Sequence, residues 1–143
     1  MSPKYLELAK ELGEYNVSRE EIIKYIMEKR EDKFADIKLK TISLPYLNSI
    51  SPTIESTALK LSEEQGELCR AIGKFRGMNG EREGIKLSHG EAYKEITKEL
   101  LDVAQTAITM ILVLEKQHGI NVEKYIDEHI EKLINKGYVE SLK

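Results

Sequence analysis

Apolar residues recur every three or four positions along most of the chain, and no pair of alternating apolar and polar runs suggests two paired strands. Such spacing places the apolar side chains on one face of an α-helix. Only three prolines interrupt the 143 residues, so long helices can form. The pattern therefore predicts an all-α protein built as a helical bundle.

Capping signals divide this pattern into separate helices. Serine, threonine, asparagine or aspartate favours a helix start, and glycine after the last turn favours a stop. Ser18 with Glu21 forms a capping-box pattern, and Ser51 precedes a proline at a first helical position. We expect helices over about residues 4–12, 19–30, 52–75, 91–118 and 122–137.

The first two expected helices form a hairpin that is too short to bury a core by itself. Residues 1–36 are therefore predicted to be a dimerisation or docking segment, and residues 37–143 the main domain. Residues 73–90 hold five of the nine glycines and should be a loop. A loop of this length often carries function.

Composition narrows the function classes. The formal net charge is −3, which does not suggest a nucleic-acid surface or a polybasic membrane patch. The longest apolar run is far shorter than the roughly 20 residues that span a bilayer. The single cysteine, Cys69, excludes an intrachain disulfide, and residues 1–10 lack the apolar stretch of a signal peptide. We expect a soluble, cytoplasmic protein without nucleic-acid or membrane partners.

Two acidic motifs carry the candidate chemistry. Glu64 and Glu67 lie three positions apart in LSEEQGEL, and Glu99 and Asp102 lie three apart in KELLD. Each pair projects from one face of its helix, beside or near an apolar stripe. If the two helices pack side by side, the four carboxylates can converge. Either motif alone would also fit a solvated face with salt bridges.

Converging carboxylates near an apolar core need cations, because like charges in a partly desolvated site raise one another's pKa. A set of oxygen ligands favours a hard divalent ion such as Mg²⁺ or Mn²⁺, often together with a phosphate-bearing substrate. A di-iron carboxylate bundle is the competitor. It uses paired Glu-x-x-His motifs, which neither acidic motif contains.

The segments KLSEEQGEL, KELLDVAQ and EKLINKGYV, with the glycine-rich interruption between the first two, resemble the MazG-like, all-α nucleoside triphosphate pyrophosphohydrolases over about residues 50–140. The resemblance implies a metal-dependent homodimer or homotetramer that hydrolyses a standard, deoxy or modified nucleoside triphosphate. The products would be the monophosphate and pyrophosphate, formed by in-line attack of water on the α-phosphorus. Housekeeping of the nucleotide pool would be its role.

The resemblance also implies roles for single residues. Mg²⁺, or Mn²⁺ in its place, would be held by Glu64, Glu67, Glu99 and Asp102, and Glu63 would orient water. A basic, phosphate-contacting segment is matched by Lys132, Asn135, Lys136 and Tyr138. Lys136 stands where the family has arginine, and lysine lacks the bidentate fork. Both lysines would also suit a helix C-terminus electrostatically.

Lys60 lies one turn before Glu64 on the same flank of the expected helix. It can reach a phosphate of the substrate, or it can form an i, i+4 ion pair with Glu64. The sequence leaves both roles open.

The N-terminal segment YLELAKELGEYNVSREEIIKYIMEKRE resembles the helical hairpin of SinI-type anti-repressors and their repressor partners. The resemblance implies a hook for dimerisation or a protein partner, with the apolar contacts made by Tyr5, Leu8, Ile22, Tyr25 and Ile26. Two alternatives stay open. The hairpin can pack on its own bundle, or the whole chain can be a non-catalytic regulator that acts through residues 1–31.

Overall fold

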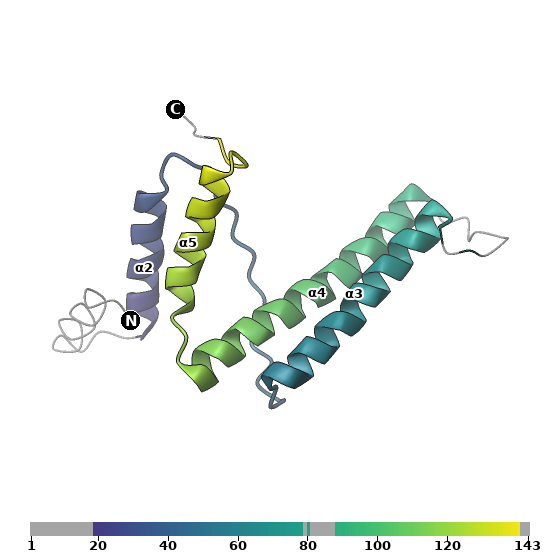
Figure 1. Cartoon of the computed structure of the whole chain (residues 1–143), viewed down its shortest axis with the longest axis horizontal. Coiled ribbons are helices and arrows are strands. Elements are labelled where there is room, and N and C mark those ends of the chain that lie inside the picture. The colour runs from purple at the N-terminus through teal and green to yellow at the C-terminus, as the bar shows by residue number, and fades with distance from the viewer. Residues whose placement is uncertain (1–18, 79, 81–87, 141–143) are drawn as a thin grey trace. The chain divides into compact units, whose positions relative to one another are not determined.

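The computed structural model describes residues 19–78, 80 and 88–140, apart from the side chains of residues 19, 20, 22, 23 and 31. Its helices are α2 (Arg19–Lys33), α3 (Ile54–Arg76), α4 (His89–His118) and α5 (Val122–Asn135) (Figure 1). These residues contain no strand, so the all-α prediction is confirmed. The helix expected over residues 4–12 lies outside the described residues.

The chain divides into two compact units. Residues 43–120 form one unit, which contains α3 and α4, and the other combines the chain up to residue 42 with residues 121–143. None of the described helices is long and apolar enough to cross a membrane.

Helix α3 begins after Thr53. The Thr53 hydroxyl accepts a hydrogen bond from the Ser56 amide at 3.1 Å, and the Ser56 hydroxyl accepts one from the Thr53 amide at 2.9 Å. This reciprocal capping box satisfies amides that the first turn leaves unpaired. The expected cap at Ser51, with Pro52 as the first helical residue, is therefore wrong by two positions.

Helix α4 begins with a second capping box. The Glu91 amide donates to the Ser88 hydroxyl at 3.3 Å, and the Ser88 amide donates to the Glu91 carboxylate at 3.0 Å. The helix therefore starts slightly earlier than the predicted Glu91. It ends at His118 as predicted, where Gly119 takes the left-handed conformation with φ 65°. A residue with a Cβ would be strained there, so glycine fits the stop.

Helices α3 and α4 pack side by side and run in opposite directions (Figure 1). Their buried residues are mostly small or polar: Thr57, Glu64, Ala92, Thr106, Thr109 and Val113. The coil before α3 is tied to α4 by two side-chain amides. Gln105 donates to the Pro45 carbonyl at 3.1 Å, and Gln117 donates to the Pro52 carbonyl at 2.9 Å. Residues 42–50 of this coil contain no helix.

The other unit pairs α2 with α5 through ion pairs. Arg30 binds Asp127 at 2.7 Å and also Glu123, and Lys33 binds Glu131 at 2.9 Å. Lys33 lies after Arg30 on α2, and its partner Glu131 lies after the partners of Arg30 on α5. The two helices therefore run in the same direction (Figure 1). Burial lowers the pKa of the Arg30 guanidinium, but its hydrogen bonds to Asp127 and Glu123 outweigh burial and raise the pKa overall.

Helix α5 follows its predicted capping pattern. The Asn121 side chain accepts a hydrogen bond from the Lys124 amide at 3.3 Å, as an N-cap does. The last helical residue is Asn135, and Gly137 follows with φ 71°. The predicted start at residue 122 is confirmed, and the helix ends two residues before the predicted end at residue 137.

The predicted hairpin contacts lie partly outside the described residues. Tyr5 and Leu8 lie outside the described residues, as does the side chain of Ile22. On α2, Tyr25 is exposed and Ile26 is half-buried. The SinI-like interaction role and the domain boundary at residue 36 stay predictions.

Candidate metal and phosphate site

Three acidic side chains from α3 and α4 converge between the two helices. Glu64 belongs to the face of α3 that packs on α4 and is only 6% exposed, whereas Glu67 and Glu99 are half-buried. One carboxylate oxygen from each of the three lies within 4.8 Å of the other two. The antiparallel packing therefore brings together residues that are 35 positions apart in the chain, Glu64 and Glu99.

The other two acidic residues predicted for the site lie apart from this cluster. Asp102 is exposed, one turn beyond Glu99 on α4. At about 100° per residue it is turned about 60° from Glu99 around the helix axis. Glu63 is also exposed, and its carboxylate lies 3.3 Å from the Lys60 ammonium. The sequence spacing predicted that Glu99 and Asp102 share one face of the helix. In the structure Glu99 is half-buried beside α3, whereas Asp102 is exposed.

Lys60 contacts the buried member of the cluster. Its ammonium lies 2.7 Å from the Glu64 carboxylate, which is the i, i+4 ion pair that the sequence allowed. Hydrogen bonds to Glu64 and then to Glu63 raise the pKa of Lys60 to about 12. A cation of the protein itself therefore offsets part of the charge of the cluster.

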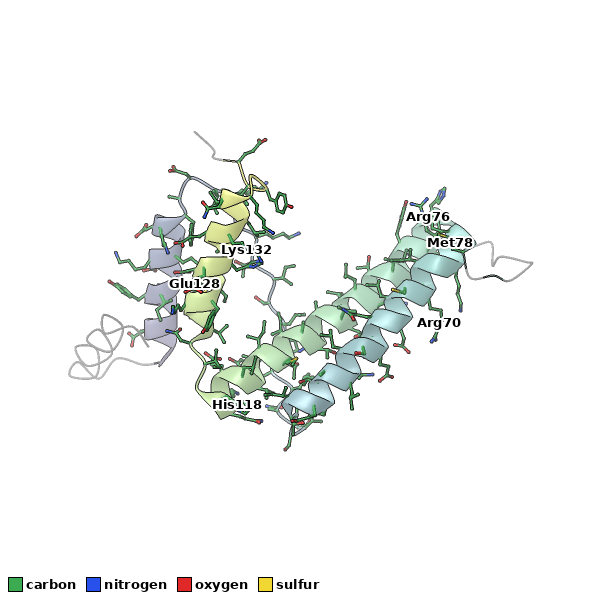
Figure 2. The ribbon with its side chains drawn as sticks, in the orientation of Figure 1. Arg70, Arg76, Met78, His118, Glu128 and Lys132 are labelled. Carbon is green, nitrogen blue, oxygen red and sulfur yellow. The ribbon has the colours of Figure 1, made fainter. Side chains whose placement is uncertain are left out.

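A cavity of about 320 Å³ opens beside the cluster, between α3 and α4. It is lined by Glu67, Arg70, Ala71, Lys74, Ala92, Glu95 and Glu99. Two carboxylates of the cluster thus form part of its wall. Figure 2 shows Arg70 projecting from α3, on the half of the helix that leads to Arg76 and Met78. The cavity is therefore lined both by carboxylates of the cluster and by the positively charged residues Arg70 and Lys74.

The carboxylate cluster fits a hard divalent cation. Its donor atoms are all oxygens, which is the ligand type that Mg²⁺ and Mn²⁺ prefer. Glu64 is buried and has only the flexible Lys60 as a salt-bridge partner among the described residues. A divalent ion would neutralise more of this charge than one ammonium can.

The predicted phosphate-contacting residues of α5 belong to the other unit. Lys132 lies in the last turn of the helix, Asn135 is its final residue, and Lys136 caps it. The Lys136 ammonium lies 5.9 Å from the centre of the Tyr138 ring, and Tyr138 is 73% exposed. Cations at this end suit the helix dipole, and their contact with a substrate stays a prediction.

The prediction of the site from sequence omitted Arg70 and Glu95, which line the cavity. A signal for Arg70 was present in the spacing. Arg70 and Lys74 follow Glu67 at three and seven positions, so all three share one face of α3. The position of Glu95 depends on the register between the two helices, which the sequence does not state.

Comparison with protein-family models matches residues 52–137 to the MazG nucleotide pyrophosphohydrolase domain. The match spans more than half of the chain and includes the acidic residues predicted for the site, Glu63, Glu64, Glu67, Glu99 and Asp102. The chain therefore belongs to the MazG family, as KLSEEQGEL and KELLD predicted. Comparisons with curated proteins and with solved structures give no match.

Proposed function

We propose that this protein is a Mg²⁺-dependent pyrophosphohydrolase that converts a nucleoside triphosphate to the monophosphate and pyrophosphate. The convergence of Glu64, Glu67 and Glu99 within 4.8 Å carries this proposal. The adjoining cavity of about 320 Å³ supports it, because it offers room for a ligand beside the carboxylates. Membership of the MazG family gives the reaction class. Nucleotide-pool housekeeping in the cytoplasm is the proposed role.

The cation would be held by Glu64, Glu67 and Glu99, with Asp102 joining from the next turn of α4. Mn²⁺ can replace Mg²⁺ because the donors are the same hard oxygens. When bound, the cation would neutralise charge on the phosphate chain and help to activate water. Asp102 is exposed, so its side chain is free to change rotamer toward the cluster.

Glu63 and Lys60 would act at the edge of the cluster. Glu63 is exposed and acidic, and can accept a proton from a water molecule or orient that water for in-line attack on the α-phosphorus. Lys60 already lies 2.7 Å from Glu64. Once a divalent ion neutralises that carboxylate, the ammonium can turn to a phosphate oxygen instead.

Lys132, Asn135, Lys136 and Tyr138 are proposed as further substrate contacts from the end of α5. Their two ammonium groups can meet phosphate charge, the amide can donate or accept, and the Tyr138 ring is exposed for stacking. These contacts complete the set that the family resemblance implies.

We also propose that the protein is a homodimer or homotetramer. Among the described residues only Phe34, Ala92 and Val113 are buried hydrophobics. Leu59, Leu100 and Leu101 are 74%, 52% and 47% exposed on α3 and α4. Exposed apolar surface of this kind marks contacts between proteins, so a second copy of the chain would bury these leucines.

The decisive test measures pyrophosphate release from a panel of ribo-, deoxy- and modified nucleoside triphosphates with Mg²⁺ or Mn²⁺. We expect cleavage of at least one nucleotide, loss of activity with a chelator, and loss in Glu64→Gln. Glu128→Gln is the matched control, because Glu128 is an exposed acid on α5 paired with Lys124 at 3.5 Å.

The proposal fails if no nucleotide is cleaved and Glu64→Gln leaves metal binding unchanged. A non-catalytic regulator would then be the better interpretation. Deleting residues 1–36 and measuring oligomer size and captured partners would examine that role.

A further inference from the structure

Two positively charged residues of α3 line the same cavity as Glu67 and Glu99. Arg70 and Lys74 follow Glu67 by one and two turns on the same helix face. Both residues line the cavity. Arg70 is exposed, whereas Lys74 is half-buried. From Glu67 to Lys74 the wall covers about 10 Å of helix axis.

Neither cation forms an ion pair with any residue that the structure describes. Glu95, which lines the same cavity, is instead bound by Lys98 at 2.6 Å. By contrast, Lys60 is paired with Glu64. The cavity thus has two positive side chains whose charge no described carboxylate meets.

We propose that Arg70 and Lys74 bind the β- and γ-phosphates of the substrate and make the site select triphosphates over diphosphates. This assignment rests on the proposed function, because it takes the α-phosphorus to lie at the carboxylate cluster. The rest of the phosphate chain then extends along the cavity toward Lys74. The leaving pyrophosphate would gain negative charge as the bond to the α-phosphorus breaks, and fixed cations stabilise such charge.

The two side chains suit different parts of this task. The guanidinium of Arg70 can donate two parallel hydrogen bonds to one phosphate group. Its exposed position lets it fold over a ligand that has already entered. The ammonium of Lys74, a half-buried residue, acts as a point charge. A diphosphate would reach fewer of these donors and should bind less tightly.

The test compares Arg70→Gln and Lys74→Gln with Arg76→Gln. Arg76 is a matched control, because it is a cation of α3 that lies 5.1 Å from the Phe75 ring and does not line the cavity. We expect KM for the triphosphate to rise about tenfold in the first two variants, as lost charge-assisted hydrogen bonds imply. KM for the diphosphate should change less. For the triphosphate, kcat should fall as well, because the leaving pyrophosphate loses the cations that stabilise its developing charge. Arg76→Gln should match the wild type.

Charge-conserving variants distinguish the loss of a phosphate contact from misfolding of the variant protein. Arg70→Lys keeps the charge and loses the fork, so it should recover part of the triphosphate affinity. Lys74→Arg should recover most of it. If neither restores affinity in a protein with an unchanged thermal midpoint, the phosphate role is overturned.

Calorimetric binding of inorganic tripolyphosphate in the presence of Mg²⁺ separates this inference from the proposed function. If no nucleotide is cleaved but tripolyphosphate binding depends on Arg70 and Lys74, the enzyme proposal fails and the phosphate assignment stands. If nucleotides are cleaved with KM unchanged in both variants, the assignment alone fails. An equal loss in Arg76→Gln would also overturn it, because a long-range charge effect would then suffice.

Discussion

The Lys60 ammonium lies 2.7 Å from the carboxylate of Glu64, the most buried acid of the cluster. The two residues are one helical turn apart, so the pair forms without help from another element. It places a protein cation where a divalent ion would also bind. Lysine and metal should therefore compete for Glu64.

We expect Lys60→Gln to bind Mn²⁺ a few-fold more tightly in the absence of nucleotide, while its KM for nucleotide rises. The first effect follows from removal of the competing ammonium, and the second from loss of a phosphate contact. Titration of Mn²⁺ followed by electron paramagnetic resonance measures the first. Lys94→Gln serves as the control, since Lys94 is an exposed lysine outside the cluster.

The pH dependence of this competition follows from the raised pKa of Lys60, about 12. A group whose pKa is raised on folding contributes its stability below the ordinary value of 10.5 and loses it as pH rises through about 12. Deprotonation of Lys60 therefore contributes nothing to metal binding near neutral pH. A Lys60-dependent titration of metal affinity below pH 9 would contradict this ion pair.

Substitution of the clustered acids should abolish most of the activity. Loss of groups that only support metal ligands costs about 10 to 100-fold, so Glu67→Gln and Glu99→Gln should each lower kcat/KM by at least about 100-fold. Asp102→Asn should cause a similar loss if Asp102 joins the loaded site. Full activity in Asp102→Asn would remove it from the ligand set and leave the cluster of three intact.

The sequence predicted the two acidic helices because their signals are local. Helical periodicity, capping residues and glycine stops act within one or two turns, so α4 ended before Gly119 where expected. The contacts that decide the site are not local. Whether Glu99 or Asp102 faces Glu64 depends on how α4 is rotated against α3, and the pairing of α2 with α5 joins residues more than 90 positions apart, such as Arg30 and Glu123. No pattern within a single segment encodes either choice.

The capping box of α4 should make the start of this helix sensitive to acid. Hydrogen bonds from the Ser88 hydroxyl and then its amide lower the pKa of Glu91. The Glu91 carboxylate therefore contributes to the stability of the fold above its ordinary pKa of 4.5, and this contribution is lost as pH falls through the lowered pKa. Ser88→Ala should lower the free energy of unfolding by about 1 kcal/mol at neutral pH. Chemical denaturation at several pH values measures both effects.

Ser62→Ala is the control for this cap. The Ser62 hydroxyl is exposed and donates to the Ala58 carbonyl within its own helix, at 3.2 Å. Its removal should change stability by no more than a few tenths of a kcal/mol. Equal losses in the two variants would argue against a special role for Ser88.

Arg30 should hold α2 against α5. Its side chain is 16% exposed, and that of its partner Asp127 is 18% exposed. Among the described residues, Arg30→Met would leave the Asp127 carboxylate with only the more distant Lys33, at 3.6 Å. Allowing for solvent screening, we expect a loss of about 1 to 2 kcal/mol. Thermal unfolding checks this, and protease sensitivity within α2 should rise.

Lys24→Met is the matched variant for that experiment. Lys24 lies on the same helix, and its only described ion pair, with Glu28 at 3.9 Å, is exposed. Exposed pairs of this kind contribute little, so its midpoint should stay near that of the wild type. A comparable fall in both variants would indicate a general charge effect on α2.

The exposed leucines of α4 should mark the contact between copies. The wild-type protein is expected to sediment as a species heavier than the 16.4 kDa chain. A Leu100→Glu and Leu101→Glu double variant should shift toward the monomer, because charges would be buried at the interface without partners. Leu39→Glu, in coil, is the control. A monomeric wild type would refute the proposed oligomer.

The side-chain amides of Gln105 and Gln117 on α4 donate hydrogen bonds to the carbonyls of Pro45 and Pro52 in the coil before α3. This segment is coil rather than helix, so none of its own amides lies in a helical hydrogen-bond ladder. Segments with few protected amides open locally at low free-energy cost. In hydrogen–deuterium exchange, residues 43–52 should therefore label well before α3 and α4. Detachment of residues 43–52 from α4 would expose Val113, while the carboxylate cluster stays assembled.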